Sequence, residues 1–229
     1  MTDLFCSALI ELVQHSRTLS DEHHRQACLI FATSGLLDKP TVTPLNIMLN
    51  SLIDTAPDFD QPIAVLKHCH ERIRKQLTTL QKLLNHLQQH GVDAGARQAA
   101  ASIMRYFNQA APHHHADEEV DLLPMLVATA QDDDARLLDQ LMPEILSEHA
   151  QMDKLWQTLN KQLVQIAGGE ITDKTAALSA QDVNQFSSMY SAHMEKEEAW
   201  IAPMAKRIFS EEQMKQLGAA MQQRRGIQV

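Results

Sequence analysis

Apolar residues recur at helical spacing along most of the chain, and no run of β-branched residues is typical of strands. Within residues 3–16 the apolar positions fall on one stripe, which predicts an amphipathic helix. Ser20 is suited to cap a second helix that ends near Gly35, and residues 45–53 are expected to form a third, short helix. The pattern therefore predicts an all-α protein.

Longer helical segments follow the loop at 54–60. They are expected over 62–90, 96–130, 135–167 and from 179 past 203, with a last helix that begins after Ser210. The predicted fold is an up-down-up-down four-helix bundle with extra N-terminal helices and a C-terminal helix. We divide the chain into an N-terminal helical segment, residues 1–57, and the bundle, residues 58–229.

Several prolines fall inside these predicted helices. Proline removes a backbone donor and clashes with the preceding turn, so it kinks or breaks a helix. We expect Pro112 and Pro203 to kink their helices. We expect Pro143 to split the third segment into a short helix over 135–142 and a long one that ends at 167.

Two stretches of the chain, 79 residues apart, read almost alike. Each has His, three residues, two Glu, four residues and Pro, at 114–124 and again at 193–203. The same offset relates His70 to His149 and Phe107 to Phe186. A fixed offset indicates a repeat, here a helical hairpin used twice. In each copy a single His precedes the His-xxx-Glu pair by 44 residues.

The helix lengths bring these histidines to one level of the bundle. His70 lies 21 residues before Gly91, and His114 lies 19 residues after Gly95. At about 1.5 Å per residue these distances are roughly 31 and 28 Å, so the chain returns to the level it left. The later legs balance in the same way. One layer is therefore expected to contain His70, His114, Glu118, His149, His193 and Glu197.

This set of side chains suits a pair of transition-metal ions. His at i and Glu at i+4 share a helix face and present an imidazole nitrogen and a carboxylate to one point. Four His and two Glu can hold two ions, each with two imidazoles and both bridged by carboxylates. The alternative is a bundle whose His and Glu only bond one another. That alternative is disfavoured, because each buried, unpaired ionisable group costs several kcal/mol.

The neighbours of these residues leave alternatives open. His115 with Glu119 is a competing register for the first pair, but only His114 keeps the repeat offset to His193. Glu119 and Glu198 are then interpreted as ordinary surface charges. Trp156, Trp200 and Tyr190 fall on the inner stripe and are expected to pack in the core. Tyr190 could instead donate a hydrogen bond to the centre.

Charge and cysteine content exclude several classes of protein. Twenty Lys and Arg against 29 acidic residues leave a net charge of −9, which disfavours nucleic acid and anionic membranes as partners. No apolar run approaches the roughly 18 residues that span a bilayer, and Met1-Thr2-Asp3 opens no signal peptide. Cys6, Cys28 and Cys69 lack metal or disulfide spacing. We therefore expect free thiols and a cytoplasmic location.

The pattern resembles the hemerythrin-like (HHE cation-binding) domain family. The signature H-x-x-x-E-E-x-x-L-x-P occurs at 114–124, and at 193–203 with Ile201 in the Leu place. The tail at 210–226 is similar to the helix that often follows such domains, so the resemblance covers 62–226. It implies a bacterial protein with two non-haem iron ions, bridged by oxide or carboxylate, that meets dioxygen, nitric oxide or peroxide. The donor atoms alone fit manganese as well as iron.

The ligand set differs from that of the oxygen-carrying hemerythrins. Those carry a second His in the third helix, where this chain has Asp153, and an Asp in the fourth helix, where it has Glu197. The set is closer to the branch that includes bacterial iron-cluster repair proteins, although their upstream Cys-Cys element is missing.

Two functional classes follow. One is a protein that binds or senses dioxygen, nitric oxide or iron; the other is a di-iron oxidative enzyme, or a stress or iron-centre repair protein. An open pocket beside the metals would favour the enzyme, and a tight apolar channel would favour the binding protein. The bulky apolar stripe of Phe107, Phe186, Trp156 and Trp200 favours the binding protein. The N-terminal helices are expected to pack on the bundle or on a second copy, as a homodimer.

Overall fold

The computed structural model describes residues 57–169 and 178–227. The chain divides into two units, residues 1–54 and 55–229. The three predicted N-terminal helices lie outside the described residues, as do Cys6 and Cys28. The predicted domain boundary after residue 57 stays a prediction.

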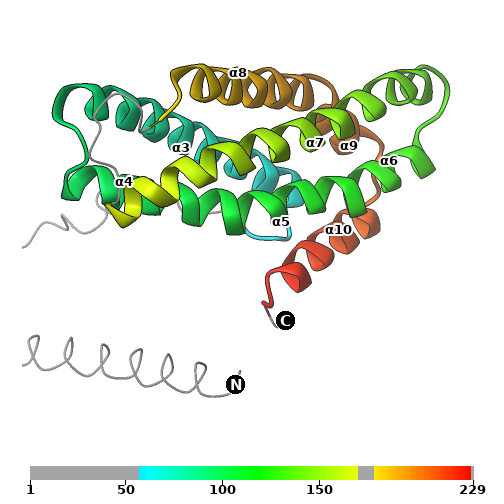
Figure 1. Cartoon of the computed structure of the whole chain (residues 1–229). Coiled ribbons are helices and arrows are strands. Elements are labelled where there is room, and N and C mark those ends of the chain that lie inside the picture. Colours follow the sequence, from blue (N-terminus) through cyan, green and yellow to red (C-terminus); the bar gives the residue numbers. More distant parts are fainter. Residues whose placement is uncertain (1–56, 170–177, 228–229) are drawn as a thin grey trace, which may run out of the picture. The chain divides into compact units, whose positions relative to one another are not determined.

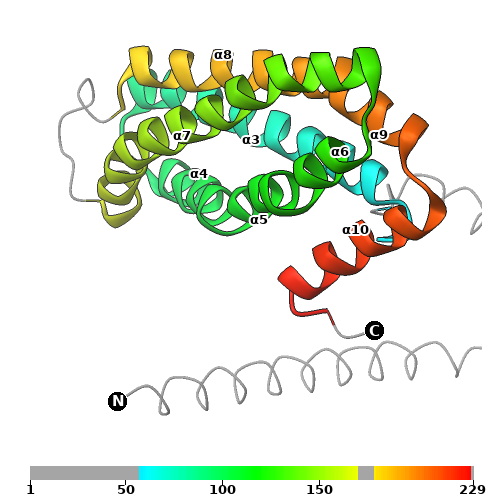
Figure 2. The same ribbon diagram turned by 90° about the vertical axis from the view of Figure 1, so that its right-hand side faces the viewer.

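The described part of the second unit contains helices and no strand, so the predicted all-α class is confirmed there. These helices form four long legs, which lie side by side in Figures 1 and 2. The first leg is α3 (Pro62–His90) and the third is α7 (Asp132–Gly168). The second leg comprises α4 (Ala94–Arg105), η1 (Tyr106–Ala110), α5 (Ala111–Ala116), η2 (Asp117–Leu122) and α6 (Leu123–Thr129). The fourth comprises α8 (Ala180–Lys196), η3 (Glu197–Ile201) and α9 (Ala202–Ile208).

The legs pack in chain order around a ring. α3 contacts α4, α4 contacts α7, α7 contacts α8, and α8 returns to α3. This order fits the predicted up-down-up-down topology. The last helix, α10 (Glu211–Arg224), lies outside the four legs and contacts α3 and η2. Ser210 precedes it as predicted and forms a capping box, in which Ser210 and Gln213 accept hydrogen bonds from each other's backbone N–H groups.

Three π-helical turns, η1, η2 and η3, interrupt the legs that carry the repeated motifs. Each ends two residues before a proline, namely Pro112, Pro124 or Pro203. A wider turn moves the missing N–H and the proline ring out of the regular α-helical ladder. The distortions expected at Pro112 and Pro203 therefore take the form of π-turns.

Pro143 behaves differently, and the prediction that it would break the third leg is wrong. α7 runs through Pro143 as one helix of 37 residues. Leu138 and Ile145, on either side of the proline, are both buried in the same apolar cluster. Packing on both sides outweighs the loss of one backbone hydrogen bond.

Two apolar clusters fill the bundle, and each leg passes from one to the other. The first cluster includes Phe107, Trp156, Phe186 and Tyr190. The second cluster includes residues from all four legs and from α10, such as Leu66, Leu126, Ile145, Met204 and Leu217. A polar layer separates the clusters at the level of His70. None of the described helices is both long and apolar enough to cross a membrane.

Candidate metal centre

The polar layer consists of the six residues that the spacing brought to one level. One His comes from α3, one from α7, and a His–Glu pair comes from each of the other two legs. All are buried, with exposed fractions between 1% and 4%: His70, His114, Glu118, His149, His193 and Glu197. Six ionisable side chains out of water in one layer require a compensating charge.

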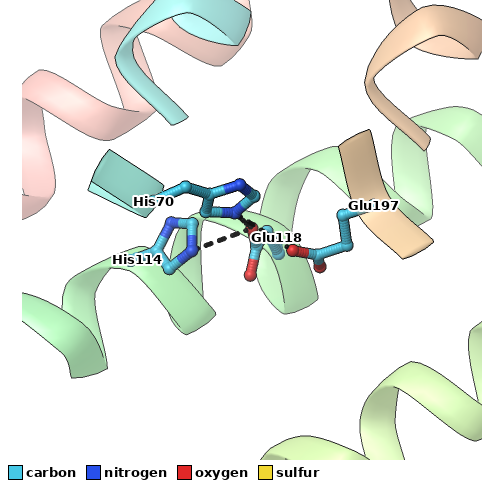
Figure 3. Close-up of side chains that lie close together, drawn as sticks. All are labelled: His70, His114, Glu118 and Glu197. Atoms are coloured by element: carbon cyan, nitrogen blue, oxygen red, sulfur yellow. Dashed lines mark ion pairs between the residues drawn. The ribbon is translucent and has the colours of Figure 1, made fainter. Parts of the chain in front are cut away.

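These residues form two groups of four whose ligand atoms lie within 4.8 Å of one another. One group has His70, His114 and the two glutamates, and Figure 3 shows these side chains converging from three legs. The other has His149, His193 and the same two glutamates. We call them the first and second half-sites. Each half-site has two imidazoles, and both share Glu118 and Glu197.

Each shared carboxylate directs one oxygen toward each half-site. Glu118 Oε1 lies 3.3 Å from His114 Nε2, and its Oε2 lies 3.5 Å from His149 Nε2. Glu197 Oε2 lies 3.2 Å from His70 Nε2, and its Oε1 lies 3.2 Å from His193 Nε2. Carboxylates placed in this way can bridge two cations.

The donor atoms fit metal ions better than they fit one another. Nε2 of His149 and Nε2 of His193 are 2.9 Å apart. Ligands about 2.1 Å from one ion, in neighbouring positions, are separated by roughly that distance. Among the described residues, His70 Nε2, Glu118 Oε2 and Glu197 Oε2 are buried and make no hydrogen bond. These three atoms lie close to other donor atoms of the layer but are not aligned for hydrogen bonds, so their lone pairs are free to bind a cation.

Carboxylates outside the layer hold the other nitrogen of three of the four imidazoles. His70 Nδ1 is 2.9 Å from Glu198, His149 Nδ1 is 2.6 Å from Glu119, and His193 Nδ1 is 2.9 Å from Glu148. Such partners fix the ring orientation and tautomer and raise the basicity of the inward nitrogen. The interpretation of Glu119 and Glu198 as ordinary surface charges is therefore wrong. Glu148 was missed, because a lone acid beside His149 gives no distinctive spacing.

Burial and charge oppose each other strongly within the layer. Burial lowers the pKa of His114 well below its usual value, and His70 adds to the effect. Burial, with the nearby charge of Glu197, raises the pKa of Glu118. Burial also opposes ionisation of Glu197, but the imidazoles of His193 and His70 beside it hold its pKa well below the usual value. Burial and the repulsion between the two carboxylates therefore oppose placing charge on both of them without a cation.

The aromatic residues around the layer take separate roles. His115 lies outside both half-sites and stacks on His149, with ring centroids 4.1 Å apart. Tyr190 Oη lies 3.3 Å from His115 Nε2, so this tyrosine reaches the centre only through His115. Trp156 is packed in the first apolar cluster as expected. Trp200 is 53% exposed, so its predicted place in the core is wrong.

A pocket of about 360 Å³ reaches the first half-site from the surface. Its buried end is formed by His70, Glu118 and Glu197. Its walls are apolar and its exposed lining includes two lysines. The walls are formed by Ile63, Leu66, Leu122, Ile201, Ala202 and Pro203. The aromatic residues block the opposite side of the layer, where the first apolar cluster lies.

Comparison with known proteins agrees with this geometry. The chain is 27% identical over 169 residues to an uncharacterized protein of Haemophilus influenzae, an alignment that covers 74% of this chain and 92% of that relative. Residues 61–205 match the hemerythrin HHE cation-binding domain, and they include both half-sites in full. The chain therefore belongs to the hemerythrin HHE cation-binding family.

Proposed function

We propose that the chain holds two non-haem iron ions, one in each half-site. The ligands are His70, His114, Glu118, His149, His193 and Glu197. The observation that carries this proposal is the sharing of Glu118 and Glu197 between two groups that each contain two imidazoles. Two neutral imidazoles and two carboxylates per ion suit iron or manganese, whereas calcium prefers oxygen ligands alone. The resemblance to hemerythrins favours iron.

The function we propose is the binding or sensing of a small ligand, such as dioxygen or nitric oxide, in the bacterial cytoplasm. A pair of irons supplies redox chemistry and coordination positions for such a ligand. The chain's own residues orient the imidazoles through Glu119, Glu148 and Glu198 and exclude water with the two apolar clusters. Homodimer formation through residues 1–57 stays a separate prediction.

Metal analysis of the full chain tests this proposal. Protein refolded anaerobically with ferrous iron is expected to contain two irons per chain, and its absorption spectrum is expected to change with dioxygen or nitric oxide. A preparation offered iron, manganese and zinc together shows which ion the site selects. One zinc and no iron under these conditions would contradict the proposal.

The pocket favours a second candidate, a di-iron oxidative enzyme that acts on a small substrate with oxygen or peroxide. A diatomic ligand needs far less space than 360 Å³, since one water takes about 30 Å³ of the liquid. Oxygen consumption by the iron-loaded chain, with and without added small molecules, distinguishes the candidates. Consumption that continues over many turnovers indicates an enzyme, and a single stoichiometric uptake indicates a binding protein.

A further inference from the structure

The pocket at the first half-site has the composition of a site for an organic molecule. Ile63, Leu66, Leu122 and Ile201 are all at most 4% exposed yet line the pocket with their apolar side chains. Its volume falls within the range of small-molecule sites, which are mostly apolar with a few placed polar groups. A molecule that fills it would contact hydrocarbon along most of its length.

The pocket lining includes three glutamates and two lysines. The buried end has the carboxylates of Glu118 and Glu197. The exposed end has Lys67 on α3 and Lys206 on α9, two helices in contact. Glu198 also lines the pocket, but Arg74 neutralises it through two hydrogen bonds. Within the described residues neither lysine is in an ion pair. The exposed end of the pocket therefore carries two positive charges without an ion-pair partner among the described residues, although the chain as a whole has a net charge of −9.

The repeat shows that these lysines are not a general property of the fold. The offset of 79 residues relates Lys67 to Leu146 and Lys206 to Val127. Leu146 and Val127 are exposed apolar residues, at 38% and 51%. The positive charge at this position accordingly belongs to the first half-site alone.

We propose that the pocket binds a small amphipathic monocarboxylate, whose carboxylate lies at Lys67 and Lys206 and whose apolar chain extends toward His70. This inference rests on the proposed function only in that the buried end of the pocket is the metal centre. The apolar walls contribute affinity through burial of the chain, and the lysines select the charged head. The reversed orientation would place the carboxylate beside Glu118 and Glu197.

Calorimetric titration of the full chain with hexanoate, octanoate, decanoate and 1-octanol tests the proposal. Affinity is expected to rise about fourfold for each added methylene. Octanoate is expected to bind more tightly than 1-octanol, with a difference that shrinks in high salt. Lys67→Met and Lys206→Met are each expected to weaken octanoate binding about two- to fivefold. The matched control, Lys161→Met, removes an exposed lysine outside the pocket and should change nothing.

A blocking variant tests the position of the chain. Ala202 is half-buried and lines the pocket, so Ala202→Trp should fill it and abolish octanoate binding while iron content stays unchanged. Ala202→Leu is a milder version in case the tryptophan variant does not fold. Octanoate binding that persists in both folded variants would overturn the proposal.

The metal-free chain separates this inference from the proposed function. Octanoate binding is expected there too, because the lysines and walls do not depend on iron. If the chain takes up no iron but binds octanoate through the lysines, the proposed function fails and the pocket assignment stands. If octanoate binds no better than 1-octanol, the pocket assignment fails whatever the iron content. If acetate and octanoate bind equally and only to the iron-loaded chain, the carboxylate sits on the metal and the proposal is wrong.

Discussion

The two half-sites come from one repeated hairpin, yet their surroundings differ. In both copies the lone histidine is held by the second glutamate of the other copy: Glu198 holds His70, and Glu119 holds His149. Glu198 is itself fixed by Arg74, whereas the offset places Asp153 at the position equivalent to Arg74. Burial, with Glu119 nearby, raises the pKa of Asp153. The repeat therefore preserves the proposed ligands and the carboxylates that contact the lone histidines, but the charged residues next to those carboxylates differ.

Residues next to the ligands differ in the same way. Asp117 and Lys196 are equivalent under the offset but opposite in charge. Asp117 is bound by Arg224, the last residue of α10, and by Arg225, which follows it, while Lys196 binds Glu144 and Glu148 of α7. The C-terminal arginines therefore lie beside the first His–Glu pair, and the acidic residues of α7 lie beside the second. A duplicated ligand set can hold a metal pair while its two sides acquire different roles.

Loss of a shared carboxylate should have the largest effect, because it damages both half-sites together. Glu118→Ala and Glu197→Ala are each expected to reduce iron from two ions per chain to fewer than one. Metal measured in the purified variants by mass spectrometry checks this. Glu195→Ala, which alters an exposed residue on the same helical leg, is the control and should keep both ions. Full iron content in Glu118→Ala would show that the half-sites do not share their ligands.

Loss of a histidine that belongs to only one half-site should reduce metal binding at that half-site more than at the other. His114→Ala and His193→Ala are each expected to lower the content to one ion at most. His113→Ala and His115→Ala should keep two ions, since neither residue belongs to a half-site. His115→Ala should also lower the melting temperature, because it removes a ring stacked on His149. Metal loss in His115→Ala with retention in His114→Ala would place the register one residue later.

Metal should stabilise the fold, and acid should remove this gain. At a thousandfold excess over Kd the bound metal contributes about 4 kcal/mol. Protons compete with the metal for the imidazoles, so the gain should be larger at pH 7.5 than at pH 5.5. The metal-free fold also weakens in acid, because burial lowers the pKa of His114 and His149 and the unfolded chain takes up more protons. Melting curves of both forms at pH 7.5 and 5.5 measure this; superimposable curves would favour a bundle without metal.

Sequence spacing predicts which six residues share one buried layer, because helix rise and the repeat offset act on the same residues. The first bundle helix has the predicted bounds, 62–90, and the two half-sites consist of the six expected residues. The π-turns were not predicted, since the sequence marks the proline but not how the helix accommodates it. The predictions for Pro143 and Trp200 are wrong because tertiary packing decides whether α7 continues through Pro143 and whether Trp200 is buried. Glu148 on α7 lies within hydrogen-bond distance of His193 on α8, and the spacing of residues within one helix cannot predict a contact between two helices.

The ion pairs of Asp117 with Arg224 and Arg225 should contribute less to the free energy of unfolding than bound metal does. Asp117 is fully buried and its carboxylate meets both Arg224 and Arg225, the latter at 2.6 Å. Removing one partner from a buried ion pair costs about 3 kcal/mol. Asp117→Asn should lower the free energy of unfolding by about that amount. Denaturant unfolding measures the loss, and Asp121→Asn, whose carboxylate is 20% exposed, should lose less. Equal losses would show that burial of Asp117 is not what anchors α10.

The smallest expected effect separates the half-sites most directly. Glu148 holds Nδ1 of His193, and the offset of 79 residues makes Cys69 its equivalent. Among the described residues, Nδ1 of His114 has no hydrogen-bond partner, as this replacement explains. Glu148→Gln should therefore weaken iron binding at the second half-site about tenfold, since loss of such a partner typically costs ten- to a hundredfold.

Cys69→Ser is the matched change in the first half-site, where the histidine has no carboxylate partner to lose. It should leave both binding steps unchanged. Anaerobic titration with ferrous iron and a competing chelator resolves the two steps and shows which one weakens. If Cys69→Ser weakened binding as much as Glu148→Gln, the thiol would support His114 as Glu148 supports His193. The two half-sites would then differ in the chemistry of this support rather than in its presence.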